Sequence, residues 1–214
     1  MENAAGRTWT LRVLGSGLVA VLLSAAIAGR ARAQPEEPFW IETEGVAAAK
    51  TPENVIGKWP ELARTIAKAM IEKYGLPHRY NDDALVWNNN GPWLKTVVRR
   101  SARSHRPGMR DTDYLEQTIH YEAPPDAAAD VRRFDKRIKL DAARNELSAR
   151  SESEQMNFLA LNLADEIARG NRSVRSARAF YSKTARLAKA GKTSAYMSGF
   201  LFKGHKFMNK VYYP

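Results

Sequence analysis

Residues 84–98 have the sequence ALVWNNNGPWLKTVV, and this stretch decides the fold. Two apolar runs, residues 84–87 and 93–98, flank the segment 88–92, which consists of three Asn residues, Gly91 and Pro92. Asn and Gly adopt positive φ at little cost, as tight turns between antiparallel strands require. The stretch therefore predicts a β-hairpin and, with it, an antiparallel sheet.

More strands are predicted on the C-terminal side of this hairpin. Residues 114–121 alternate between apolar and polar side chains, which indicates a strand with one buried face. Residues 137–142 and 146–150 form a possible second hairpin about Arg144 and Asn145. The alternative for this region is that a short helix, beginning near Asp126 and reaching Phe134, continues past Ile138.

Helices are predicted on both sides of the strands. Pro60 suits the first helical position, and Gly75 with Pro77 ends a helix that runs to Tyr74. Residues 151–154 (SESE) have capping-box spacing before a broad apolar arc that reaches Ile167. A further helix, residues 173–190, has one apolar and one basic side.

The expected fold class is α+β. A small antiparallel sheet of about four strands packs against an N-terminal helix and two or three C-terminal helices. The expected domain organisation is a signal peptide at 1–33, a loosely ordered leader at 34–58, a single domain at 59–191 and a basic aromatic tail at 192–214.

The N-terminal segment has the pattern of an export signal. Basic residues precede an apolar run from Val13 to Gly29, and Ala31-Arg32-Ala33 supplies a small-x-small cleavage pattern. Cleavage after Ala28 and retention of the segment as an anchor are the two alternatives. The expected location is therefore the periplasm or the external medium.

Charge is distributed unevenly along the chain. The formal net charge is +11, yet the last acidic residue is Glu166, and the residues after it include eleven basic and no acidic side chains. This asymmetry suggests a polyanionic or membrane-surface partner. The chain contains no cysteine, which excludes thiol catalysis, cysteine-bound metals and lipoprotein anchoring.

The candidate binding residues follow from this charge pattern. They are Arg175, Arg178, Lys183, Arg186 and Lys189 on the predicted helix and Lys203, Lys206 and Lys210 in the tail. We expect a non-enzymatic binding or scaffolding protein of the cell envelope, docking on an anionic membrane surface or an acidic envelope polymer. Nucleic acid is the less favoured polyanion. The structural alternative is an ordinary solvated helix face with the tail aromatics folded onto the core.

Two other functions remain open from the sequence. His105, Asp113 and His120 supply imidazole and carboxylate groups for a metal-dependent or acid–base hydrolase, although their spacing matches no ligand motif. Trp87 and Trp93 could instead stack on a sugar or peptide, or dock another envelope protein together with the tail aromatics. The structural alternative is that the two rings pack on each other or on the core. No motif for a cofactor is present.

Three segments resemble an uncharacterised family of small exported bacterial proteins. They are WNNNGPW at 87–93, ELSAR at 146–150 and MNFLALNLA at 156–164. The resemblance covers about residues 67–183 and implies no activity, cofactor or catalytic residue. A weaker likeness, through Tyr74-Gly75-Leu76-Pro77, is to small lipoproteins of outer-membrane assembly, but this chain has no cysteine to carry a lipid.

Overall fold

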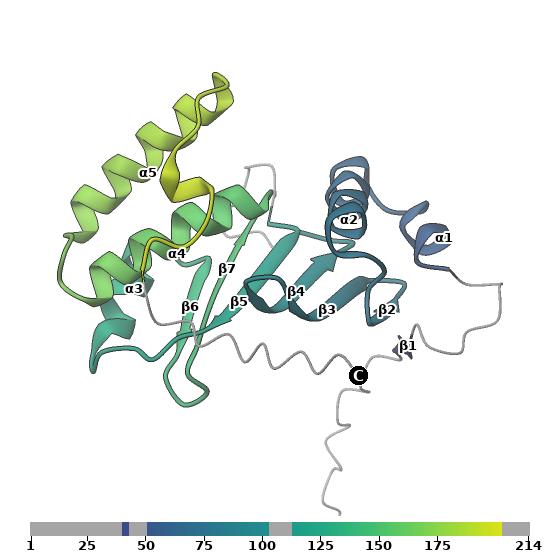
Figure 1. The fold of residues 1–214 in the computed structure, drawn as a ribbon, viewed down its shortest axis with the longest axis horizontal. Coiled ribbons are helices and arrows are strands. Elements are labelled where there is room, and N and C mark those ends of the chain that lie inside the picture. The colour runs from purple at the N-terminus through teal and green to yellow at the C-terminus, as the bar shows by residue number, and fades with distance from the viewer. Residues whose placement is uncertain (1–39, 43–50, 103–112, 203–214) are drawn as a thin grey trace, which may run out of the picture. The chain divides into compact units, whose positions relative to one another are not determined.

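The computed structural model describes residues 40–42, 51–102 and 113–202, and these residues fold into a mixed α and β structure (Figure 1). Seven antiparallel strands form one sheet in the order β1-β2-β3-β4-β5-β7-β6. The strands are β1 (Ile41–Glu42), β2 (Arg79–Asn81), β3 (Ala84–Asn90), β4 (Trp93–Arg99), β5 (Leu115–His120), β6 (Ile138–Asp141) and β7 (Glu146–Ser151).

The predicted α+β class is confirmed, but the predicted number of about four strands is wrong. β1 and β2 are missed because they have only two and three residues, too few to show an alternating pattern. Both predicted hairpins are present, β3 with β4 and β6 with β7. The alternative of a helix past Ile138 is also wrong, since the backbone is already extended at Asp135.

The β3–β4 hairpin turns where the asparagines predict it. Asn89 and Gly91 have φ values of 50° and 61°, in the left-handed region. The register pairs Asn90 with Trp93, while Leu94 and Lys95 are both exposed. Two consecutive exposed residues break the alternation, so Trp93 and Thr96 are both buried although they lie three positions apart.

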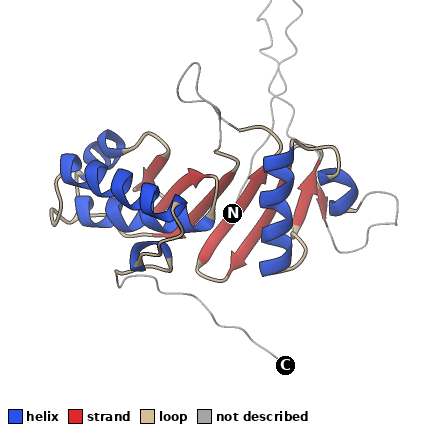
Figure 2. Ribbon diagram, turned by 90° about the horizontal axis from the view of Figure 1, so that it is seen from above, coloured by secondary structure: helices blue, strands red, loops and turns tan. Residues whose placement is uncertain are grey.

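Helices cover one face of the sheet in two groups, α1 with α2 and α3 to α5 (Figure 2). The helices are α1 (Pro52–Ile56), α2 (Glu61–Tyr74), α3 (Ala127–Phe134), α4 (Glu154–Ala168) and α5 (Val174–Lys189), followed by a 3-10 turn at Ala195–Met197. The first group covers a core cluster that contains Leu85, Trp87 and Val98. The second group covers a cluster built around Leu147 and the inner side of α4.

Two local predictions need correction. Part of the segment 34–58, expected to be loosely ordered, forms β1 and α1, and α1 is capped by the Thr51 hydroxyl. The capping box at residues 151–154 does not form, because Ser151 still belongs to β7 and the N-cap of α4 is Ser153. Glu154 is therefore the first residue of α4, where it is buried.

The tail is ordered at its beginning. We call residues 194–202 the C-terminal segment. Asn162 of α4 donates to the carbonyl oxygens of Tyr196 and Gly199, at 3.0 and 2.8 Å, and accepts from the Leu201 amide at 2.8 Å. Phe200 packs edge-on against Trp93, with ring centroids 5.2 Å apart. The aromatics of this segment therefore belong to the core.

Candidate functional site

The basic side of α5 is the candidate site that the sequence predicted, and the helix has the predicted extent. Ser173 caps its first turn by accepting from the Ser176 amide at 3.2 Å. At the other end Gly191 takes a φ of 76°, which lets the Lys192 amide donate to the Leu187 carbonyl at 2.9 Å. Ala177 and Thr184 are buried on the inner side, which packs on α3 and α4.

Four of the predicted cations are exposed on the outer side of α5. Arg175, Lys183, Arg186 and Lys189 form no ion pair with any residue that the structure describes. At the usual helical rise the row extends about 21 Å along the axis. These four residues, which we call the cationic row, present positive charge over most of the length of the helix.

Arg178 has a different role from the one predicted. Its Nε donates to the Phe134 carbonyl at 3.1 Å, and its Nη2 donates to the Arg133 carbonyl. These acceptors are in the last turn of α3, where carbonyl oxygens lack partners within the helix. Arg178 is therefore engaged in joining α5 to α3.

Basic residues just before α5 are neutralised, in contrast to the cationic row. Arg169 pairs with Asp165 at 2.7 Å, and Arg172 pairs with Glu166. The hydrogen bond that Arg169 donates to Asp165, followed by the negative charge of Asp165, raises the pKa of Arg169. Pairing therefore stops where the acidic residues stop, and the unpaired positive charge begins with α5.

The remaining predicted tail cations and one histidine cannot be placed. Lys203, Lys206, Lys210 and His105 lie outside the described residues, as does the predicted signal peptide at 1–33. Among the residues that the structure describes, no helix is long and apolar enough to cross a membrane.

The two tryptophans of the hairpin are in the core and not on the surface. Trp87 is 0% exposed and Trp93 is 1% exposed, so neither ring offers a face to a sugar or a partner protein. They also belong to different clusters and do not stack on each other. Trp87 donates to the Gly75 carbonyl at 2.9 Å, and Trp93 packs on Phe158 with centroids 4.8 Å apart. The stacking prediction for these residues is not supported.

The described members of the proposed hydrolase site lie apart. Asp113 lies two residues before β5 and His120 is its last residue, so the whole strand, about 17 Å long at the usual rise, lies between them. Asp113 is buried and pairs with Arg137 at 3.6 Å, while His120 lies 3.9 Å from Glu122. Within the described parts of the chain no three histidine or acidic side chains are grouped to hold a metal ion.

A buried carboxylate forms the most connected polar site, and the sequence analysis missed it. Glu154 accepts hydrogen bonds from Lys73, from the Tyr74 hydroxyl, from Trp93 Nε1 at 2.6 Å and from Gln117 Nε2 at 3.4 Å. We call these five residues the Glu154 cluster. They come from α2, β4, β5 and α4, so the cluster joins the two groups of helices through the sheet.

Electrostatics keep this carboxylate ionised. Burial by itself would raise the pKa of Glu154, but the hydrogen bonds from Lys73, Tyr74 and Trp93 outweigh burial and lower it. Burial and the adjacent carboxylate together raise the pKa of Tyr74, so its hydroxyl remains a donor. The predicted capping box gives the Glu154 side chain a backbone amide as its partner. The residue type at position 154 is therefore interpreted from the sequence as a helix cap and not as a buried acceptor for side chains of other elements.

A second polar group lies next to the Glu154 cluster. Asn157 donates to Gln117 Oε1 at 3.0 Å and accepts from the Ser151 hydroxyl at 2.8 Å. Asn157 is 0% exposed, and its amide is paired to the sheet. A buried amide satisfied in this way fixes the rotation of α4 relative to the strands. The arrangement positions α4, which in turn supports α5.

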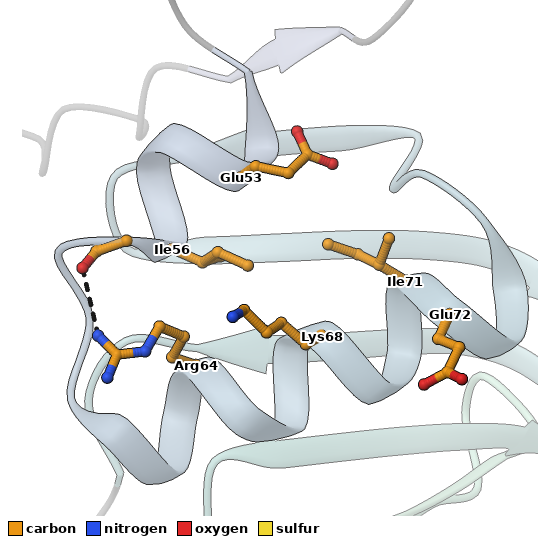
Figure 3. Close-up of a pocket in the computed structure, with 7 residues that line it drawn as sticks. Glu53, Ile56, Arg64, Lys68, Ile71 and Glu72 are labelled. Atoms are coloured by element: carbon orange, nitrogen blue, oxygen red, sulfur yellow. Dashed lines mark hydrogen bonds between the residues drawn. The ribbon is translucent and has the colours of Figure 1, made fainter.

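A shallow pocket lies between α1 and α2 (Figure 3). Arg64 and Lys68 line it from α2, facing Glu53 of α1, and Arg64 donates to the Gly57 carbonyl at 3.3 Å. The opposite charges of the lining largely cancel, and Ile56 and Ile71 add apolar surface. This pocket lacks the single sign of charge that α5 presents.

Comparison of this chain with family models, with curated proteins and with solved structures finds no match. The resemblance to exported bacterial proteins therefore remains an expectation from three short segments.

Proposed function

We propose that this protein is a non-enzymatic component of the cell envelope that docks on anionic surfaces through α5. The observation that carries the proposal is the cationic row, which is exposed and has no acidic partner among the described residues. An anionic membrane surface or an acidic envelope polymer suits this row best. Another envelope protein or a nucleic acid remains a possible partner to be tested.

The energetics of α5 support a functional role for its charge. Surfaces of soluble proteins normally mix both signs, and like charges three or four residues apart destabilise a helix by about 0.2–0.5 kcal/mol per pair. Lys183, Arg186 and Lys189 form two such pairs in succession. Arg175 also lies in the first turn, at the positive end of the helix dipole. The helix dipole favours Arg186 and Lys189 in the last turn and offsets part of this cost, and an anionic partner would relieve the remainder.

The expected strength of docking follows from the number of cations. A basic side chain close to an anionic bilayer contributes about 1 kcal/mol, so the four cations of the row provide about 4 kcal/mol together. Such binding is reversible and decreases with salt, because exposed charges are screened over about 10 Å at 0.1 M.

The test uses the chain from Gln34 onward, which contains every residue that the structure describes, including both groups of helices. Co-sedimentation is measured with anionic vesicles, neutral vesicles and an immobilised acidic polysaccharide across a salt series. One variant replaces the four cations of the row by Gln. The matched control replaces four exposed cations elsewhere, two of them lysines and two arginines, by Gln: Lys58, Lys95, Arg132 and Arg144.

The two variants lose the same charge, so their comparison separates the effect of the α5 surface on binding from the effect of net charge. The proposal predicts that the α5 variant loses most anionic binding and the control keeps it, with unchanged circular dichroism in both. Equal losses in the two variants, or no binding of the unchanged chain to any anionic material at low salt, would contradict the proposal.

A further inference from the structure

An exposed leucine borders the cationic row, at the edge of the apolar side of α5. Leu187 is 45% exposed, directly after Arg186 and one helical turn after Lys183. The other large apolar side chains of α5, Val174, Phe180 and Tyr181, are at least partly buried against the rest of the protein. Leu187 is therefore the large apolar group of α5 that faces solvent beside the cations.

We propose, resting on the proposed function above, that the anionic partner is a phospholipid bilayer and that Leu187 inserts among its lipids. The flanking Lys183 and Arg186 then contact headgroup phosphates, while the leucine side chain leaves water. A soluble polyanion such as DNA or an acidic polysaccharide binds the same cations through its charges but does not bury a leucine. The leucine distinguishes a bilayer from the other anionic partners.

The shape of the site also fits a flat partner. The cationic row lies on the outer side of one helix, and no residue of the row lines the pocket between α1 and α2. Its cations do not converge on one point, as recognition of a single small anion requires. In Figure 1 the C-terminal end of α5 points away from the sheet. Leu187 belongs to the last turn of this helix and is exposed.

The first experiment compares Leu187→Gln with Leu62→Gln in the chain from Gln34 onward. Leu62 is a matched control, because it is 41% exposed on another helix, α2. We expect Leu187→Gln to weaken partitioning onto anionic vesicles about tenfold, the factor expected for removing a half-exposed aliphatic side chain from lipid contact. Binding to DNA and to acidic polysaccharide should stay unchanged, and Leu62→Gln should alter neither.

The second experiment measures depth directly. The chain contains no cysteine, so Leu187→Cys and Leu62→Cys each provide one site for a spin label. The label at residue 187 should become inaccessible to a water-soluble relaxation agent and accessible to oxygen when anionic vesicles are added. The label at residue 62 should remain accessible to the water-soluble agent.

The outcomes separate the two proposals. If the four-cation variant loses vesicle binding while Leu187→Gln binds as the unchanged chain does, the bilayer inference is overturned and the proposed function stands. Tighter binding to polysaccharide or DNA than to anionic vesicles also overturns the inference. If the four-cation variant binds all anionic materials normally, the proposed function itself fails.

Discussion

Replacing Glu154 by Ala should destabilise the protein by about 3 kcal/mol. The substitution leaves the Trp93 indole N–H, whose residue is 1% exposed, without its acceptor at 2.6 Å. A buried donor left unpaired costs about 1–3 kcal/mol, and the loss of a charged acceptor with several donors raises the total. Lys73 contributes little, because its side chain is 52% exposed and solvent replaces the carboxylate.

Urea unfolding, followed by tryptophan fluorescence on the chain from Gln34 onward, measures this loss. Glu154→Gln keeps an oxygen acceptor for Trp93 but removes the charge, so a smaller loss of about 1–2 kcal/mol is expected. The matched control is Glu72→Ala, an exposed carboxylate in the last turn of α2, which should change stability by less than about 0.5 kcal/mol. A loss in Glu154→Ala as small as in the control would refute the role of the cluster.

The pH dependence provides an independent check of the same charge. The pKa of Glu154 in the folded protein lies below its ordinary value of 4.5, so the unfolded chain takes up the proton first as pH falls. The stability that the ionised carboxylate contributes is thus present above about pH 4.5 and lost in more acidic solution. The difference in stability between the unchanged chain and Glu154→Gln should therefore shrink as pH falls below that value. A constant difference would show that the charge is not responsible.

Three further predictions concern the hairpin, the C-terminal segment and α5. Gly91→Ala should lower the free energy of unfolding by about 2 kcal/mol, and Gly170→Ala should lower it by about 1 kcal/mol. Both glycines have positive φ, which alanine adopts at a cost, but a Cβ at residue 91 would also lie 3.0 Å from a tyrosine ring. Equal losses in urea unfolding would argue against that contact. Asn162→Ala removes three hydrogen bonds to the C-terminal segment, so proteolysis within this segment should accelerate about tenfold. An unchanged cleavage rate would mean that the aromatic contacts alone hold the segment in place. Ala179→Glu places a carboxylate four residues before Lys183, which should stabilise the helix by about 0.3–0.5 kcal/mol and weaken binding to anionic vesicles. Ala179→Gln is the neutral control, and equal binding of the two variants would contradict docking through α5.

Local sequence signals predict most of the elements because each depends on neighbouring residues. The asparagines and Gly91 set the backbone of the central turn, and Ser173 with Gly191 sets both ends of α5. Strands β1 and β2 escape prediction because their pairing to β3 depends on long-range contacts and not on a pattern within two or three residues. The number of strands was therefore underestimated while the class of fold was correct.

The site is predicted less completely, for a related reason. Exposure of the cationic row follows from helical periodicity, which the sequence contains. The role of Arg178 and the Glu154 cluster depend on which distant groups come close, such as the carbonyl of Phe134 or the indole of Trp93. Packing of Trp93 on the core is one of two alternatives that the sequence offers, and local alternation does not decide between them because it breaks along β4 between residues 93 and 96. No local pattern reports such contacts.

The fold explains how α5 can carry uncompensated charge. Its inner side needs only small and aromatic residues to pack, and its ends are fixed by Ser173 and Gly191. The helix beneath it, α4, is held by Glu154 at its first residue and by Asn157 in its first turn, on the side away from α5. Because these contacts do not use the outer side of α5, acidic residues there are unnecessary for folding. The fold therefore does not require the absence of acids after Glu166, and the proposed anionic partner accounts for it; the exchange of four cations on α5 against four elsewhere tests this proposal.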